Sequence, residues 1–82
     1  MADAKEYLGI YRGAVLDNAD PMRLKRLKVH VPAFAGGAPL DWASPCVPVG
    51  KSAVPPIGAI VWVMFEAGDP SQPVWMGTLV TR

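Results

Sequence analysis

Two apolar runs near the C-terminal end of the chain are separated by an acidic, proline-rich stretch. The runs extend from Ala59 to Glu66 and from Val74 to Thr81, and the stretch between them reads AGDPSQP. Short runs rich in β-branched and aromatic residues, bounded by glycine and proline, are typical of strands. Since the intervening residues favour turns, the pattern predicts a β-hairpin over residues 59–81.

A second hairpin is predicted nearer the N-terminus. An apolar run from Tyr7 to Leu16 is followed by the turn-forming residues DNADP, and the next segment, Arg23 to Val31, alternates with a period of two. The predicted solvent side of that segment carries Arg26, Lys28 and His30, and the predicted core side carries Leu27, Val29 and Val31.

The connection between the hairpins, residues 32–56, is rich in proline. Because proline cannot donate to a ladder, we expect only a short edge strand there, around Trp42 to Val49. With nine prolines and eight glycines the chain has almost no helix signals. Five strands in one small domain predict an all-β fold, a five-stranded Greek-key barrel of the OB type with a long proline-rich connection. An SH3-like barrel is the alternative. Glycines expected where strands bend are Gly9, Gly13, Gly58 and Gly77.

The first strand of the C-terminal hairpin is apolar on both faces. Successive side chains of a strand point to opposite sides, so Val61, Val63 and Phe65 are expected inside the barrel. The other set is expected to form an outer apolar patch, which usually marks an interface. The alternative is that the connection and the N-terminal residues cover it. The predicted interface residues are Ile60, Trp62, Met64 and Met76.

Composition supports association. A chain of 82 residues buries only about 60% of its unfolded surface, and 51% of its residues are hydrophobic while 18% are charged. The net charge of +1 favours neither nucleic acid nor an acidic membrane surface as a partner. The N-terminal residues MADAKEYLG lack the apolar region of a signal peptide, and no apolar run approaches the span of a bilayer. We therefore expect a soluble protein made in the cytosol, without membrane insertion.

An ordered set of motifs resembles a known family. The segments are YRGAVLDNADP (11–21), RLKVHVP (26–32), WASP (42–45), PIG (56–58) and FEAGDPSQPVWMG (65–77). In this order they are similar to the OB-fold domain of phage baseplate hub and tail-spike proteins, which also occurs in the valine-glycine-repeat spike proteins of type VI secretion. The resemblance covers Leu8 to Leu79. We expect residues 1–6 to be an extension and residues 7–82 a single OB-fold domain.

The resemblance implies a structural role in a contractile-injection-type machine. It implies an OB-fold adaptor, a homotrimer around the tail axis, that joins the central hub to a tip or spike protein in the virion and is assembled in the host cytoplasm. Long members of the family continue into a lysozyme domain or a β-helical needle, whereas this sequence ends at Arg82. The family usually has glycine before the arginine of its second strand, where this chain has Lys25.

The motif residues have fold-making explanations. Asp17, Asp20 and Asp69 are expected to accept backbone N–H bonds in turns. Trp42 and Trp75 are expected to bury large areas and to need an acceptor for each indole N–H. The motif and turn residues as a set are Asp17, Asp20, Pro21, Arg26, Trp42, Gly58, Glu66, Gly68, Asp69, Pro70, Trp75 and Gly77.

Catalytic or metal chemistry has little support. His30 lies in a basic face rather than beside a carboxylate, and we expect a solvated or interface residue. Cys46 lies between two prolines, and we expect a buried, inert thiol. Two Cys or His residues are too few for structural zinc. We therefore expect no enzyme activity and no cofactor. If both hairpin turns meet at one end of the barrel, four carboxylates, namely Asp17, Asp20, Glu66 and Asp69, gather there, either as turn chemistry or as an ion site.

The rival function is binding of single-stranded nucleic acid or oligosaccharide, because OB barrels often use a strand face for it. Tyr7 and Tyr11 would supply stacking rings beside a basic stripe. The alternative is that this stripe is solvated or contacts another subunit, which the small net charge favours. The stripe consists of Arg23, Lys25, Arg26, Lys28 and His30.

Overall fold

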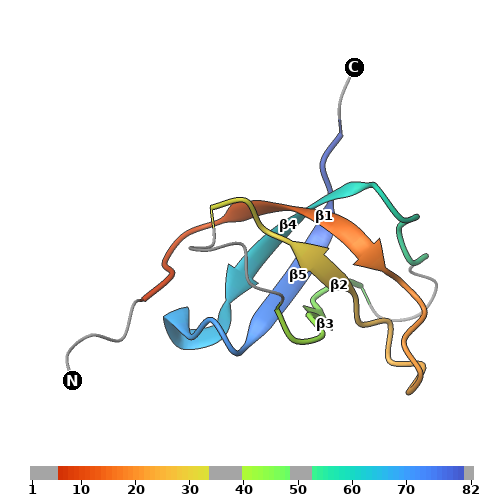
Figure 1. The fold of residues 1–82 in the computed structure, drawn as a ribbon, viewed down its shortest axis with the longest axis horizontal. Coiled ribbons are helices and arrows are strands. Elements are labelled where there is room, and N and C mark those ends of the chain that lie inside the picture. Colours follow the sequence, from red (N-terminus) through yellow and green to blue (C-terminus); the bar gives the residue numbers. More distant parts are fainter. Residues whose placement is uncertain (1–5, 34–39, 49–52, 81–82) are drawn as a thin grey trace.

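A computed structural model describes residues 6–33, 40–48 and 53–80 of the protein. These residues form strands β1 (Tyr11–Asp17), β2 (Lys28–His30), β3 (Ser44–Pro45), β4 (Ile60–Phe65) and β5 (Pro73–Thr78), with a 3₁₀ turn η2 (Glu66–Gly68) after β4. Figure 1 shows the strands curling around one another, with almost no helix. The all-β prediction is confirmed.

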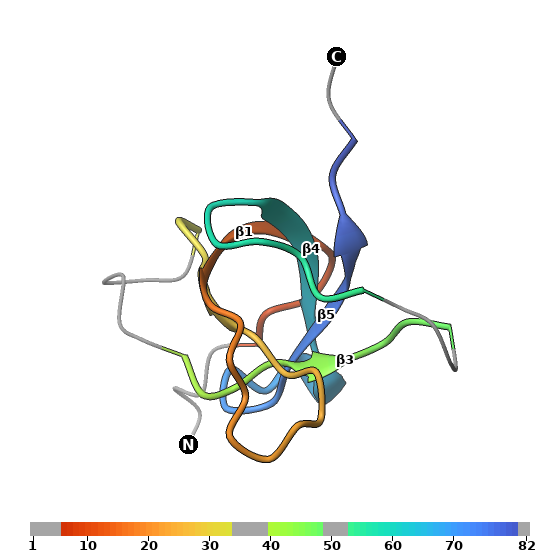
Figure 2. The same cartoon turned by 90° about the vertical axis from the view of Figure 1, so that its right-hand side faces the viewer.

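The strands form a single sheet in the order β2-β1-β4-β5-β3. The pairs β1–β2, β1–β4 and β4–β5 are antiparallel and β3–β5 is parallel. Both predicted hairpins are therefore present. The residues next to the two outermost strands also pair, since Leu27 and Ala43 exchange two backbone hydrogen bonds, of 3.0 and 2.6 Å between N and O. This bridge curls the sheet toward closure, as Figure 2 shows, and the arrangement is that of a small OB-type barrel.

The second strand is shorter than its alternating sequence predicts. Only Lys28–His30 form β2, and Arg23 to Arg26 belong to the preceding loop. Arg23 and Lys25 have φ values of 57° and 60°, in the left-handed region, which interrupts an extended strand. The predicted edge strand is present as the two residues of β3.

Alternation along the strands builds the core. Val61, Val63 and Phe65 of β4 are buried, as predicted, and so are the apolar residues of the second strand segment. A Cβ at Gly13 would lie 3.0 Å from Cγ2 of Val63, so this glycine lets β1 approach the core closely. The buried residues are Val15, Leu27, Val29, Val31, Leu40, Ala43, Val61, Val63, Phe65 and Trp75.

The tryptophans expected in the core have different environments. Trp75 is a fully buried core residue, and its indole N–H donates to the carbonyl of Lys25 at 3.0 Å. The expectation that Trp42 also belongs to the core is wrong. Trp42 is only half-buried, because its ring lies beside the solvent-facing side chains of the segment that contains β2. The guanidinium carbon of Arg26 lies 5.5 Å from the centre of the ring, and Nζ of Lys28 lies 5.2 Å from it.

The two rings should therefore differ in their effect on stability. Trp75→Ala should lower the free energy of unfolding by about 3–5 kcal/mol, because it empties the barrel. Trp42→Ala should lower it by about 1 kcal/mol, the loss of exposed cation–π contacts. Urea denaturation followed by circular dichroism measures both. Equal losses in the two variants would contradict the assignment of Trp42 to the surface.

Candidate functional site

The first candidate surface is the outer face of the C-terminal hairpin, which consists of Ile60, Trp62, Met64 and Met76. None of these side chains belongs to the core, because alternation directs their neighbours inward. Met64 is 41% exposed and the other three are half-buried. These residues lie outside the buried core, and their role as an interface stays a prediction.

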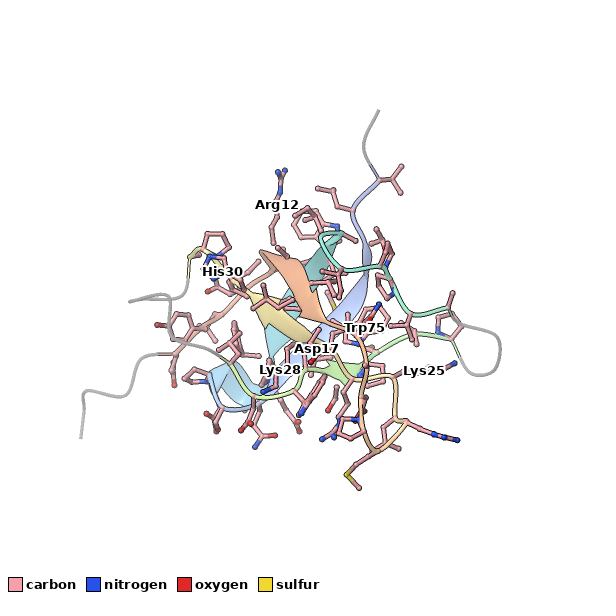
Figure 3. All side chains as sticks on the ribbon, turned by 45° about the vertical axis from the view of Figure 1, so that its right-hand side comes forward. Arg12, Asp17, Lys25, Lys28, His30 and Trp75 are labelled. Carbon is pink, nitrogen blue, oxygen red and sulfur yellow. The ribbon has the colours of Figure 1, made fainter. Side chains whose placement is uncertain are left out.

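Arg12 of β1 covers part of this outer face. It pairs with Trp62 across the β1–β4 ladder, and its guanidinium carbon lies 5.6 Å from the centre of the indole ring. Figure 3 shows the Arg12 side chain projecting from the barrel surface. The face therefore combines an aromatic ring with a cation, a pairing that is enriched at protein interfaces.

The segments expected as alternative covers make contacts elsewhere in the described residues. The Tyr7 N–H donates to the carbonyl of Gly68, and the Tyr7 ring lies 5.5 Å from Phe65. Before β4, the Asn18 side-chain amide donates to the carbonyl of Pro55. These contacts hold the two segments against opposite ends of the barrel.

The second candidate surface is the loop between β1 and β2, which one carboxylate organises. Asp20 accepts hydrogen bonds from the backbone N–H groups of Met22, Leu24 and Arg26 at 2.9–3.2 Å. Its oxygens also accept from Nε and Nη2 of Arg26, each at 2.8 Å. The side chain of Asp20 is only 2% exposed. The bonds from Arg26, and then those from the backbone, hold the pKa of Asp20 well below its usual range.

The tip of this loop was missed by the sequence interpretation. Met22 and Leu24 are 65% and 54% exposed, and they alternate with Arg23 and Lys25. The predicted strand from Arg23 to Val31 includes Leu24, Arg23 and Lys25, which belong to this loop instead. The signal that could have revealed the loop is Lys25, which stands where the family resemblance expects glycine and has a φ of 60°.

The other turn residues lie as predicted. Asp17 accepts from the N–H of Ala19, and Asp69 accepts from the N–H and the hydroxyl of Ser71. These bonds from Ser71 lower the pKa of Asp69. Pro21 and Pro70 lie in turns. Three glycines have positive φ values. Gly58 (92°) lies in the turn before β4, and Gly68 (74°) ends η2. Gly77 (131°) lies where the register between β4 and β5 shifts.

The four carboxylates do not gather at one end of the barrel. Because β1 pairs antiparallel with β4, with Tyr11 opposite Val63, the turn after β4 lies where β1 begins. The loop after β1 therefore lies at the other end, and Figure 1 shows it opposite η2. Asp17 and Asp20 belong to the loop end, whereas Glu66 and Asp69 belong to the η2 end. Among residues 6–33, 40–48 and 53–80, no three Cys, His, Asp or Glu side chains are placed to share a metal ion.

Two further residues were candidates for chemistry. His30 is exposed on β2, as expected. Cys46 is also exposed, so the prediction of a buried thiol is wrong. Cys46 directly follows β3, and its backbone N–H donates to the carbonyl of Trp75. Its side chain is exposed whereas its neighbours Pro45 and Val47 are half-buried, as expected where successive side chains point to opposite sides. The described part of the chain has no pocket, and none of its helical segments is long and apolar enough to span a bilayer.

The basic stripe is also less suited to nucleic acid than its sequence suggests. Arg26 forms a two-point ion pair with Asp20, and both Arg26 and Lys28 lie over the Trp42 ring. The expected stacking rings pack against the core, since the Tyr11 ring lies 5.7 Å from that of Phe65 and near the Tyr7 ring. Both rings and two of the five basic residues, Arg26 and Lys28, therefore engage other protein groups.

Comparison with models of protein families gives a match over most of the chain. The family model for the type VI secretion system and phage-baseplate injector OB domain matches residues 11–79, a range that contains all five described strands. No curated protein matches the chain.

Asp20→Asn should lower the melting temperature at neutral pH, because the ion pair with Arg26 is lost. Since the pKa of Asp20 is lower in the folded than in the unfolded protein, the carboxylate stabilises the fold above about pH 4. That stabilisation declines as the pH falls further toward the folded pKa. The difference in melting temperature between wild type and variant should therefore shrink from about pH 7 to about pH 2. Glu66→Gln, at an exposed position at the opposite end of the barrel, is the control for net charge, and a pH-independent difference would contradict the expectation.

Lys25→Gly should be more stable than Lys25→Ala by about 1 kcal/mol, because only glycine adopts a φ of 60° without a steric cost. Both variants remove the lysine side chain, so their difference isolates the backbone. Thermal denaturation of the pair gives the result. If the alanine variant were the more stable of the two, Lys25 would not occupy the left-handed region.

Proposed function

Since the chain belongs to the family of type VI secretion system and phage-baseplate injector OB domains, we propose that it is a structural adaptor in a phage tail baseplate. It joins the central hub to a tip or spike protein, and it is neither an enzyme nor dependent on a cofactor. Its place is the tail of the virion, after assembly in the host cytoplasm. The family match supports a structural role in such a machine. The position between hub and tip is the more specific part of this proposal.

The adaptor assembles as a homotrimer through the outer face defined above. The observation that carries this proposal is the two-faced strand β4, whose inner residues fill the barrel and whose outer residues leave Trp62 and Met64 at the surface. Tryptophan, methionine and arginine are enriched in interfaces. A barrel of this size also has a small core, so burial of a second apolar face adds stability that the monomer lacks.

Trp62→Glu should leave the barrel folded and dissociate the assembly, because it places a charge in the proposed interface without touching the core. Light scattering coupled to size exclusion, at two concentrations, should show a trimer for the wild type and a monomer for the variant. Ile57→Glu is the matched control, since Ile57 is an exposed apolar residue of the turn before β4 and does not belong to the outer face. A variant that stays trimeric, or a wild type that is monomeric throughout, would refute this interface.

A further inference from the structure

The two ends of the barrel expose apolar side chains among charges of opposite sign. At one end, the loop tip presents Met22 and Leu24 together with the cations Arg23 and Lys25. At the other end, Leu8 and Ile10 are 68% and 52% exposed. Among the residues that the structure describes, those with charged side chains at that end are Glu6, Glu66 and Asp69. We call these two surfaces the basic loop and the acidic end.

The basic loop is preorganised. Three of its backbone N–H groups bind the Asp20 carboxylate, and its Lys25 carbonyl accepts the indole N–H of the buried Trp75. Left-handed φ values at Arg23 and Lys25 are unfavourable for residues with a Cβ, and the surrounding hydrogen bonds maintain them. A loop that is already ordered loses little conformational entropy when it docks. Its exposed apolar tip is therefore suited to insertion into a complementary surface.

The acidic end is also held in place. The Tyr7 N–H donates to the Gly68 carbonyl at 2.9 Å, which ties the N-terminal segment to η2. A Cβ built on Gly68 would meet Cδ2 of Leu8 at 3.1 Å and Cβ of Glu6 at 3.4 Å. Glu6 and Leu8 therefore lie against η2, which carries Glu66. The acidic end therefore carries exposed apolar side chains together with carboxylates. It resembles the basic loop in apolar character and has the opposite charge, so the two surfaces are complementary.

We infer that the basic loop of one copy docks on the acidic end of a second copy. The antiparallel pairing of β1 with β4 places these surfaces at opposite ends of the barrel, as Figure 1 shows. A contact between two different surfaces of identical chains is head-to-tail, and it closes into a ring when the rotation allows. The inference rests on the proposed self-assembly and names a second contact within it, distinct from the outer face.

Charge reversal at each end tests this contact. Arg23→Glu/Lys25→Glu, and separately Glu6→Lys/Glu66→Lys, should each weaken self-association by about tenfold or more in the dissociation constant. The variant that combines all four changes has the net charge of the wild type and opposite charges on its two ends, so it should regain self-association. Sedimentation equilibrium at low salt and at high salt measures the constants, and circular dichroism confirms that each variant is folded.

The control and the remaining outcomes separate the proposals. His30→Glu/Ser44→Glu adds two negative charges at exposed positions of strands β2 and β3, which belong to neither the basic loop nor the acidic end. It should leave the constant within about twofold of the wild type, as surface charges remote from a contact do. If the wild type associates and Trp62→Glu dissociates it while the end variants do not, the head-to-tail contact is wrong and the proposed outer interface stands. The head-to-tail contact is also wrong if the variant that combines all four changes does not regain self-association. A wild type that never associates overturns both, and the basic loop would then serve another partner.

Discussion

The ion pair between Asp20 and Arg26 determines the conformation of the barrel's loop end. The carboxylate is almost inaccessible to solvent, and it binds three backbone N–H groups as well as two nitrogens of the guanidinium. Charge-assisted bonds of this two-point geometry are among the stronger polar interactions in proteins. The loop is therefore held in one conformation although Arg23 and Lys25 must adopt left-handed backbone angles within it.

Two features of the core depend on that conformation. The Lys25 carbonyl lies where it accepts the indole N–H of Trp75, which allows the largest core side chain to be buried without losing a hydrogen bond. The next residue after Arg26 is Leu27, whose backbone pairs with Ala43 and brings the β2 side of the sheet to the β3 side. Because β2 and β3 are so short, this bridge does much to close the barrel, and closure protects the edges of a sheet from pairing with other chains.

Local patterns in the sequence predicted the features that depend on local chemistry. Alternation assigned Val61, Val63 and Phe65 to the interior, and turn propensity identified the backbone-binding roles of Asp17, Asp20 and Asp69. The misassigned features depend on distant pairings. The four carboxylates separate because β1 is antiparallel to β4, and no local pattern contains that information. Trp42 lies outside the core because Arg26 and Lys28 of a neighbouring segment hold its ring at the surface.

The buried polar side-chain atoms in the described part of this small barrel have hydrogen-bond partners within the protein itself. This explains why its outer surfaces, rather than an internal site, are the candidates for function. Within the described residues, no polar or charged residue is buried in the core, and every buried side-chain nitrogen and oxygen has a hydrogen-bond partner. The motif groups with the strongest interactions, Asp20, Arg26 and the Trp75 indole, bind one another or nearby backbone. Chemistry at a reacting centre needs polar groups directed at a ligand, whereas these are directed inward at the fold. What the barrel presents outward is apolar side chains and charges on a rigid frame, and these are the components of an assembly contact.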